Sequence, residues 1–190
     1  MTEMLSLLRV KTTPLAATAL LVSLAACSSI GRDHSPGPQG VRNCTAGLRL
    51  EVGQSCGLLV EAARKEVPLP IKLDIGDKYV VQVLGGHVWS DWGRDAVNPL
   101  VGDQGNWLMR LFSQLKRMPA EPYMVIGLAV SGCNPDDASD CRRQRFEGRL
   151  GSAGYELAVP EPLSVRFFAN DVPWLNGNNS GAVWVLVQRY

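Results

Sequence analysis

One carboxylate and several carboxamides lie in a short loop near the C-terminus of the sequence. Asp171, Asn178 and Asn179 belong to a stretch rich in Asn, Gly and Pro that runs from residue 170 to 181. Side-chain oxygens of this kind, with only one full charge among them, suit a hard cation such as Ca²⁺. The same residue types are ordinary turn formers, so a polar hairpin loop without a ligand is the alternative.

The segments that must position this loop have the periodicity of β-strands. Short runs rich in Val, Leu, Ile and aromatic residues are separated by turn signals such as Gly85-Gly86 and Asn176-Gly177. Many short strands with this punctuation are typical of a β-sandwich or barrel, so we expect an all-β fold. The predicted strands are 57–63, 69–73, 78–84, 123–130, 155–159, 163–169 and 182–188.

One segment has a different period. From Asn106 to Arg117, apolar residues recur at helical spacing, and Lys116 and Arg117 stand near the C-terminal end, where cations complement the helix dipole. The pattern predicts a single amphipathic helix whose apolar face packs on the sandwich. A role at a membrane surface is the alternative.

The N-terminus indicates export. Arg9 and Lys11 precede an apolar run from Leu15 to Ala26, which is too short to span a membrane and fits a secretory signal. Leu-Ala-Ala-Cys at its end resembles the bacterial lipoprotein signal, which implies lipidation of Cys27; an ordinary cleaved signal is the alternative. We therefore expect a signal peptide over 1–26, a tether over 27–42 and one domain over 43–190. By the same resemblance, Ser28 after the cysteine favours the outer membrane.

The other four cysteines are an even number in an oxidising compartment, which favours disulfides. Four cysteines allow three pairings, and proximity in the sequence favours Cys44–Cys56 and Cys133–Cys141. A metal-thiolate site is the weaker reading because CxxC spacing and a nearby histidine are both missing.

Charge and histidine content argue against two functional classes. The formal net charge is +1, without a Lys/Arg cluster, so nucleic-acid binding gains no support. Only His34 and His87 are present, and His34 lies in the expected tether. Because the usual inventory of an active site is sparse, we do not expect an enzyme.

Four segments, taken in order, resemble the PA-IL family of calcium-dependent galactose-binding bacterial lectins. They are Trp-Ser-Asp-Trp-Gly at 89–93, Asp-Gln-Gly at 103–105, Asn-Asp-Val-Pro at 170–173 and Gly-Asn-Asn-Ser-Gly at 177–181. The similarity runs, with gaps, from about Gly57 to Val187. It implies a jelly-roll-like β-sandwich with Ca²⁺ at its tip, where two sugar hydroxyls complete the coordination.

The resemblance also implies the roles of individual residues. The calcium ligands would be the side chains of Asp171, Asn178 and Asn179 with the main-chain carbonyls of Leu175 and Trp92. The sugar contacts would come from Gln104, Asp171, Val172 and Asn178.

The sequence departs from the family at two places. Trp174 stands where the family has glycine, and its indole is expected either to stack on a pyranose or to pack on the protein. The family's His-Pro has no clean counterpart, and residues 100–102 are inserted. We therefore expect a galactoside-like ligand of undefined identity, bound without catalysis. A non-catalytic envelope assembly protein that binds a protein partner through the same loops is the alternative function.

Overall fold

The structure is a computed structural model that describes residues 38–84, 88–91, 96–134 and 140–190. The expected signal peptide, the lipidation of Cys27 and most of the tether lie outside these ranges, as do Trp92 and both histidines. The described residues all belong to one compact unit.

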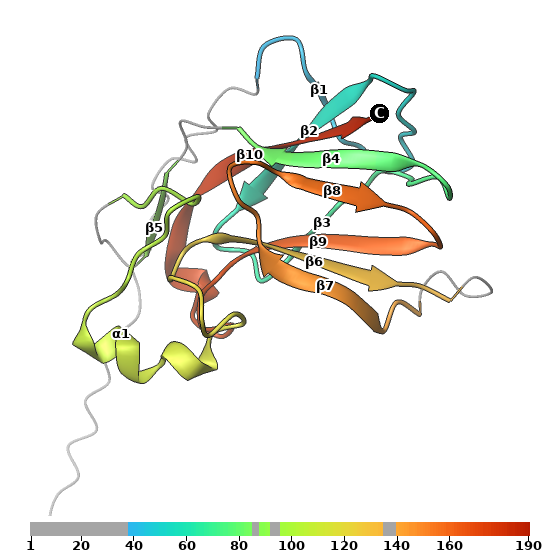
Figure 1. The fold of residues 1–190 in the computed structure, drawn as a ribbon. Helices are drawn as coiled ribbons and strands as arrows, with labels where there is room; N and C mark the ends of the chain where they lie inside the picture. Colours follow the sequence, from blue (N-terminus) through green and yellow to red (C-terminus); the bar gives the residue numbers. More distant parts are fainter. Residues whose placement is uncertain (1–37, 85–87, 92–95, 135–139) are drawn as a thin grey trace, which may run out of the picture. The chain divides into compact units, whose positions relative to one another are not determined.

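Two β-sheets form the body of this unit, as Figure 1 shows. The larger sheet has the strand order β1-β2-β10-β4-β8, and β5 pairs with β10 off this path. The smaller sheet has the order β3-β9-β6-β7. The strands of the larger sheet are β1 (Arg42–Asn43), β2 (Ser55–Glu61), β4 (Lys78–Val83), β5 (Trp89–Asp91), β8 (Tyr155–Ala158) and β10 (Asn179–Arg189). Those of the smaller sheet are β3 (Val67–Pro68), β6 (Ile126–Gly132), β7 (Arg143–Arg149) and β9 (Leu163–Ala169). The all-β sandwich predicted from the sequence is confirmed.

The core is built mainly from residues of both sheets that face the space between the sheets. Tyr79, Trp89 and Phe167 are among its largest fully buried side chains. The strand β6 is buried along its whole length because a second, smaller cluster of Met118, Val125, Ala129 and Phe168 covers its other face. Gly127 of β6 allows this contact, since a Cβ there would lie 2.3 Å from the Phe168 ring.

Most predicted strands appear within a few residues of their expected bounds, and β9 coincides with the predicted segment 163–169. The predicted strand 69–73 is wrong: the chain there is irregular, and the short strand β3 precedes it. Pro70 has no N–H to donate to a ladder, which disfavours a strand at this place. The strand β7 was not predicted, because its arginine-rich sequence has no apolar alternation.

The predicted helix exists, but it is shorter than predicted and its apolar face is not buried. It comprises α1 (Trp107–Leu111) and a 3-10 turn η1 (Ser113–Leu115), separated by Phe112. The prediction that its apolar face packs on the sandwich is wrong, because neither element contains a buried residue. The buried contacts come instead from the end of the segment, where Lys116 and Met118 enter the protein. In the described ranges, no helix has the length and apolar character needed to cross a membrane.

Both disulfides expected from proximity are present and confirm that pairing. Cys44–Cys56 joins the segment of β1 to β2, and Cys133–Cys141 closes the connection between β6 and β7. The Cys44–Cys56 bridge has a sequence separation of 12 and fastens the chain that follows β1 to the neighbouring strand β2.

Candidate functional site

The Asn-rich loop joins the two sheets at one end of the sandwich. It leaves β9 in the smaller sheet after Ala169 and enters β10 in the larger sheet at Asn179 (Figure 1). Two successive turns shape it: Leu175 N–H donates to Val172 O at 2.8 Å, and Asn178 N–H donates to Leu175 O at 3.0 Å. The second turn is the short 3-10 helix η2 (Asn176–Asn178). Both ends of the loop are therefore fixed by regular structure.

Asn170 fastens the start of this loop to the segment that precedes β6. Its side chain is fully buried; the amide donates to Met118 O at 3.0 Å and Pro122 O at 2.9 Å, and its oxygen accepts from Met118 N–H at 2.9 Å. Its main chain exchanges hydrogen bonds with Met124 and Val125, and Met124 has the left-handed φ of 58°. Such a backbone costs free energy unless its surroundings hold it, so Asn170 is a structural clamp beside Asp171.

The side-chain oxygens of the loop are buried but unsatisfied. Asp171 is only 4% exposed, and its Oδ2 has no hydrogen-bond partner in the described part of the chain. The same is true of the Oδ1 atoms of Asn176, Asn178 and Asn179. A buried oxygen left without a partner costs about 1–3 kcal/mol. Four such atoms within nine consecutive residues are therefore a strong sign that something else satisfies them.

The other buried oxygens without a hydrogen bond in the described ranges have a different explanation. Asp77 Oδ2 lies 2.8 Å from an Arg189 nitrogen, and Asp140 Oδ1 lies 2.8 Å from an Arg142 nitrogen. These two carboxylates are thus compensated by ion pairs. The loop from Asp171 to Asn179 has no equivalent cation in contact with its oxygens among the ion pairs of the described residues.

Burial raises the pKa of the Asp171 carboxyl above its usual value, and three neighbours oppose the rise. They are Val172 N–H, which donates to Asp171 Oδ1 at 2.6 Å, the Asn179 side chain and the positive charge of Lys116. The structure thus brings Asp171 and Asn179 together as interacting groups. A carboxylate that is costly to keep charged in isolation is one that a cation would stabilise.

This shift predicts the pH dependence of the metal-free fold. Because the folded chain holds the Asp171 proton more tightly than the unfolded chain, protonation stabilises the fold. The contribution of the protonated carboxyl to the free energy of unfolding is fully present below the unfolded pKa of about 3.9. It is lost as pH rises through the raised pKa of the folded state. Urea unfolding in chelator at pH values from about 4 to 7 should show Asp171→Asn gaining stability relative to wild type as pH rises. A stability difference that does not change with pH would contradict this assignment.

The other residues predicted for the site lie in different environments. Leu175 is exposed and its carbonyl accepts one hydrogen bond, which leaves a second lone pair on that oxygen. Val172 is buried in the core, so only its main chain faces the loop. Trp174 is 68% exposed and does not fold back on the described domain. Trp92, predicted to supply a carbonyl, lies outside the described residues.

Gln104 lies on the neighbouring loop, which is attached to the same region through Tyr123. Asp103 and Tyr123 exchange main-chain hydrogen bonds of 2.7 and 2.8 Å, and Asp103 Oδ1 accepts from Gly105 N–H at 2.8 Å. Gln104 is left exposed beside a hollow of about 480 Å³ that Val97, Asn98 and Val101 also line. Gly102 makes this loop possible, since its φ is +76° and a Cβ would lie 2.5 Å from the Val125 side chain.

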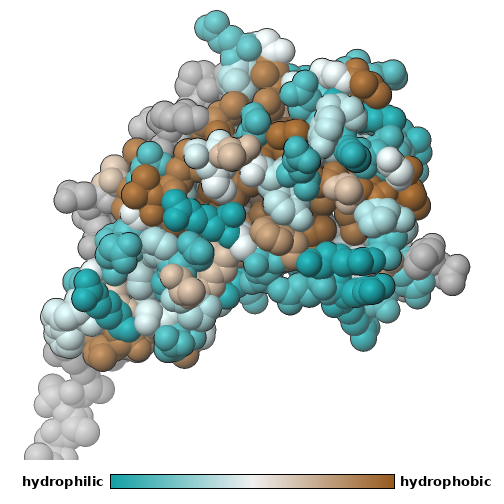
Figure 2. Space-filling model, viewed as in Figure 1, coloured by the Kyte–Doolittle hydropathy of each residue, from teal (hydrophilic) through white to brown (hydrophobic). Residues whose placement is uncertain are grey.

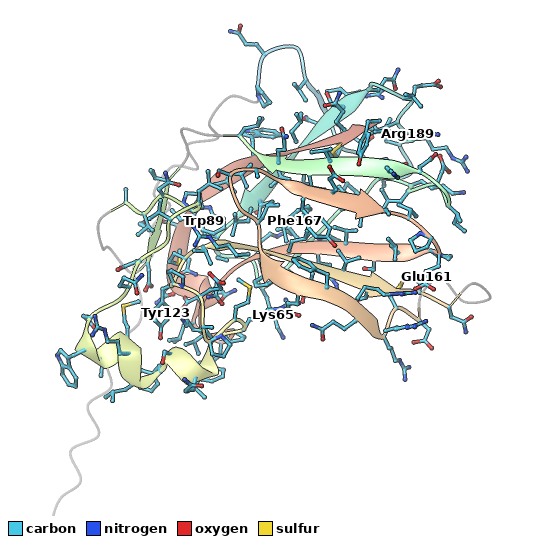
Figure 3. The ribbon with its side chains drawn as sticks, viewed as in Figure 1. Lys65, Trp89, Tyr123, Glu161, Phe167 and Arg189 are labelled. Atoms are coloured by element: carbon cyan, nitrogen blue, oxygen red, sulfur yellow. A yellow bond between two sulfur atoms is a disulfide. The ribbon has the colours of Figure 1, made fainter. Side chains whose placement is uncertain are left out.

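Tyr123 links this loop electrostatically to the Asn-rich loop. Burial raises the pKa of its hydroxyl, and the negative charges of Asp171 and Asp91 raise it further. Figure 3 shows Tyr123 and Trp89 toward the end of the sandwich that carries α1. The predicted metal and sugar residues that the structure describes thus belong to one end of the fold.

Two residues of this region were not assigned by sequence reasoning. Asn176 contributes one of the unsatisfied oxygens, and Asp91 of β5 lies directly opposite Asn179 in the β5–β10 ladder. Cross-strand neighbours of this kind share a face of the sheet, so a second carboxylate lies near the loop. Asn176 could have been proposed from its place in the loop, whereas the pairing of Asp91 depends on the fold.

The donor set fits Ca²⁺ better than a softer metal. Among the described residues, no group of three or more His, Cys, Asp or Glu side chains is arranged to hold a metal. A metal at this loop would therefore rest on carboxamide, carbonyl and few carboxylate oxygens, which are ligands of hard cations.

No protein-family model and no curated protein matches the sequence. Among solved structures, the chain is similar to one described as "EclA N-terminal domain; PllA-like lectin". The two are 15% identical with a TM-score of 0.41, over 70% of this chain and 95% of that chain. This is a weak relation to a lectin fold and does not establish a family, so membership of the PA-IL family stays a prediction.

Proposed function

We propose that this chain is a lipid-anchored protein of the bacterial outer membrane that binds carbohydrate through Ca²⁺, without catalysis. The observation that carries the proposal is the group of four buried, unsatisfied oxygens between Asp171 and Asn179. The anchor and the location are supported by the N-terminal sequence alone.

Asp171, Asn176, Asn178 and Asn179 would hold the ion with their side chains, and Leu175 with its carbonyl. Bound Ca²⁺ accepts six to eight oxygen ligands, so it would offer coordination positions to neighbouring hydroxyls of a sugar. With one buried carboxylate in the loop, we expect a dissociation constant of about 10⁻⁴–10⁻³ M, as in extracellular calcium modules. Gln104 and Trp174, which are both exposed, would contact the rest of the sugar.

Calcium titration by calorimetry, followed by a glycan array with and without chelator, tests the proposal. We expect calcium binding, and glycan binding that requires calcium and favours galactosides. Failure of the wild-type chain to bind calcium would refute the metal site. Calcium binding without any glycan signal would refute the carbohydrate part alone.

Trp174 provides a separate test of the sugar contact. Its indole is exposed, so Trp174→Ala should leave the free energy of unfolding and the calcium affinity unchanged. Loss of stacking on the sugar should weaken binding of the best glycan of the array about fivefold, equivalent to about 1 kcal/mol. Trp107→Ala, which removes a comparably exposed indole from α1, is the matched control and should bind as wild type. Equal effects of the two changes would contradict a specific role of Trp174.

A further inference from the structure

The segment from Trp107 to Leu115 presents large apolar side chains to solvent. Trp107 is 74% exposed and Leu111 67% exposed. Figure 2 shows brown, hydrophobic atoms along the lower edge of the region that α1 occupies in Figure 1. We define the α1 apolar surface as the set Trp107, Leu108, Leu111, Phe112 and Leu115, all of which are exposed.

This surface is held in place and is not a frayed end. Asn106 caps α1 by accepting a hydrogen bond from Met109 N–H at 2.9 Å, and the Met109 side chain packs against the core. The Tyr123 hydroxyl donates to Met109 O. At the other end, Lys116 donates to Glu121 O and its ammonium lies 4.3 Å from the centre of the Tyr123 ring. The fold therefore fixes one side of the segment and turns the apolar side outward.

The charged residues within the segment that carries this surface are all cations. From Gln104 to Ala120 the sequence contains three cations and neither Asp nor Glu. Lys116 is buried and Arg117 pairs with Glu66 and Glu147, so Arg110, exposed in the last turn of α1, is the cation next to the apolar side chains. Trp, Phe and Leu beside a cation are the composition of helices that lie in a membrane interface, where anionic headgroups attract the positive charge.

The size of the surface favours a bilayer over a protein. A stable protein interface uses about 20–30 residues on each side, far more than this short segment supplies. Entry into lipid has no such requirement, because each buried CH₂ contributes about 0.8 kcal/mol by itself.

The acyl anchor of the proposed function, on which this step rests, would bring such a bilayer within reach of the domain. Residues 28–37 separate Cys27, where the sequence predicts an acyl anchor, from Pro38, and they can extend about 35 Å. Stable anchoring commonly takes two membrane contacts, and a tether makes the second one intramolecular.

We propose that the α1 apolar surface inserts into the interface of a phospholipid bilayer that carries anionic headgroups, as a second membrane contact of the tethered domain. This contact is separate from the calcium site and does not require it.

Flotation with vesicles of phosphatidylethanolamine and phosphatidylglycerol tests the proposal. The chain is made from Ser28 onward, without an acyl anchor, because the described core and both disulfides lie within residues 38–190. We expect the wild type to float with the vesicles in chelator, and Leu111→Glu to lower the bound fraction about tenfold. Val52→Glu and Ile75→Glu, at similarly exposed apolar positions outside α1, are the matched controls and should bind as wild type.

Three results would overturn the proposal. The first is a wild type that does not float, and the second is a Leu111→Glu variant that floats equally well while circular dichroism shows it folded. The third is a wild-type dimer in sedimentation velocity that Leu111→Glu dissociates, which would assign the surface to a second copy of the chain. If the wild type floats with calcium but not in chelator, the membrane contact depends on calcium, and the proposal that it does not require the calcium site is wrong.

Discussion

Replacing Asp171 by Asn is expected to abolish calcium binding while the metal-free fold persists. Asp171 supplies the one carboxylate of the loop, and its burial makes the negative charge costly unless a cation compensates it. Removing that charge should weaken the affinity about 100-fold or more, equivalent to about 3 kcal/mol, because affinity for Ca²⁺ follows the charge of the ligands. Calorimetric titration of the variant with calcium measures this loss.

The matched control for this change is Asp140→Asn. Asp140 also has a buried carboxylate oxygen without a hydrogen bond, but an arginine compensates it in the connection between β6 and β7. We expect this variant to bind calcium as the wild type does. Calcium binding of wild-type strength by Asp171→Asn would show that Asp171 does not hold the ion.

Asn170→Ala is expected to destabilise the fold by about 3–5 kcal/mol, which is a large effect for a single substitution. The change removes hydrogen bonds to Met118 O, Pro122 O and Met118 N–H, and these buried main-chain groups would be left unsatisfied. Each such group costs about 1–3 kcal/mol. Urea unfolding gives the free energy of unfolding of wild type and variant.

Asn98→Ala is the control for this prediction. Asn98 is exposed, and within the described ranges its side chain accepts one hydrogen bond, from Leu100 N–H at 2.8 Å. Its loss should lower the free energy of unfolding by less than about 1 kcal/mol. If Asn170→Ala lowers the free energy of unfolding no more than Asn98→Ala does, Asn170 does not hold the loop in place.

The strands could be predicted where one face of the sheet is buried. The segment 163–169 alternates clearly and became β9, whereas β7, at the edge of the smaller sheet, escaped prediction because Phe146 is its one large apolar side chain. The periodicity of residues 106–117 predicted a helix but not its environment. Spacing tells which side chains share a face, and only the fold decides whether another element covers that face.

The sequence predicted which residues belong to the candidate site, but it did not predict their burial, their hydrogen bonds or their neighbours on other strands. The sequence shows Asp171, Asn178 and Asn179 in one loop, but their burial depends on β9 and β10 belonging to different sheets. Asparagine is a common turn residue, so nothing in the sequence around Asn170 distinguishes it from an ordinary turn or predicts its hydrogen bonds to the segment before β6. Asp91 lies next to Asn179 only through the pairing of β5 with β10, which joins positions far apart in the chain.

The strand β10 has a consequence for how quickly the loop can respond to an ion. It begins at Asn179, where residues 179–181 pair with β5, and continues to Arg189 through the ladders with β2 and β4, so the loop ends in a strand that is anchored in the larger sheet. The oxygen of Asn179 is thus preorganised, and capture of an ion should require little ordering of the backbone. Rapid exchange of the metal would then be governed by water at the ion rather than by opening of the protein.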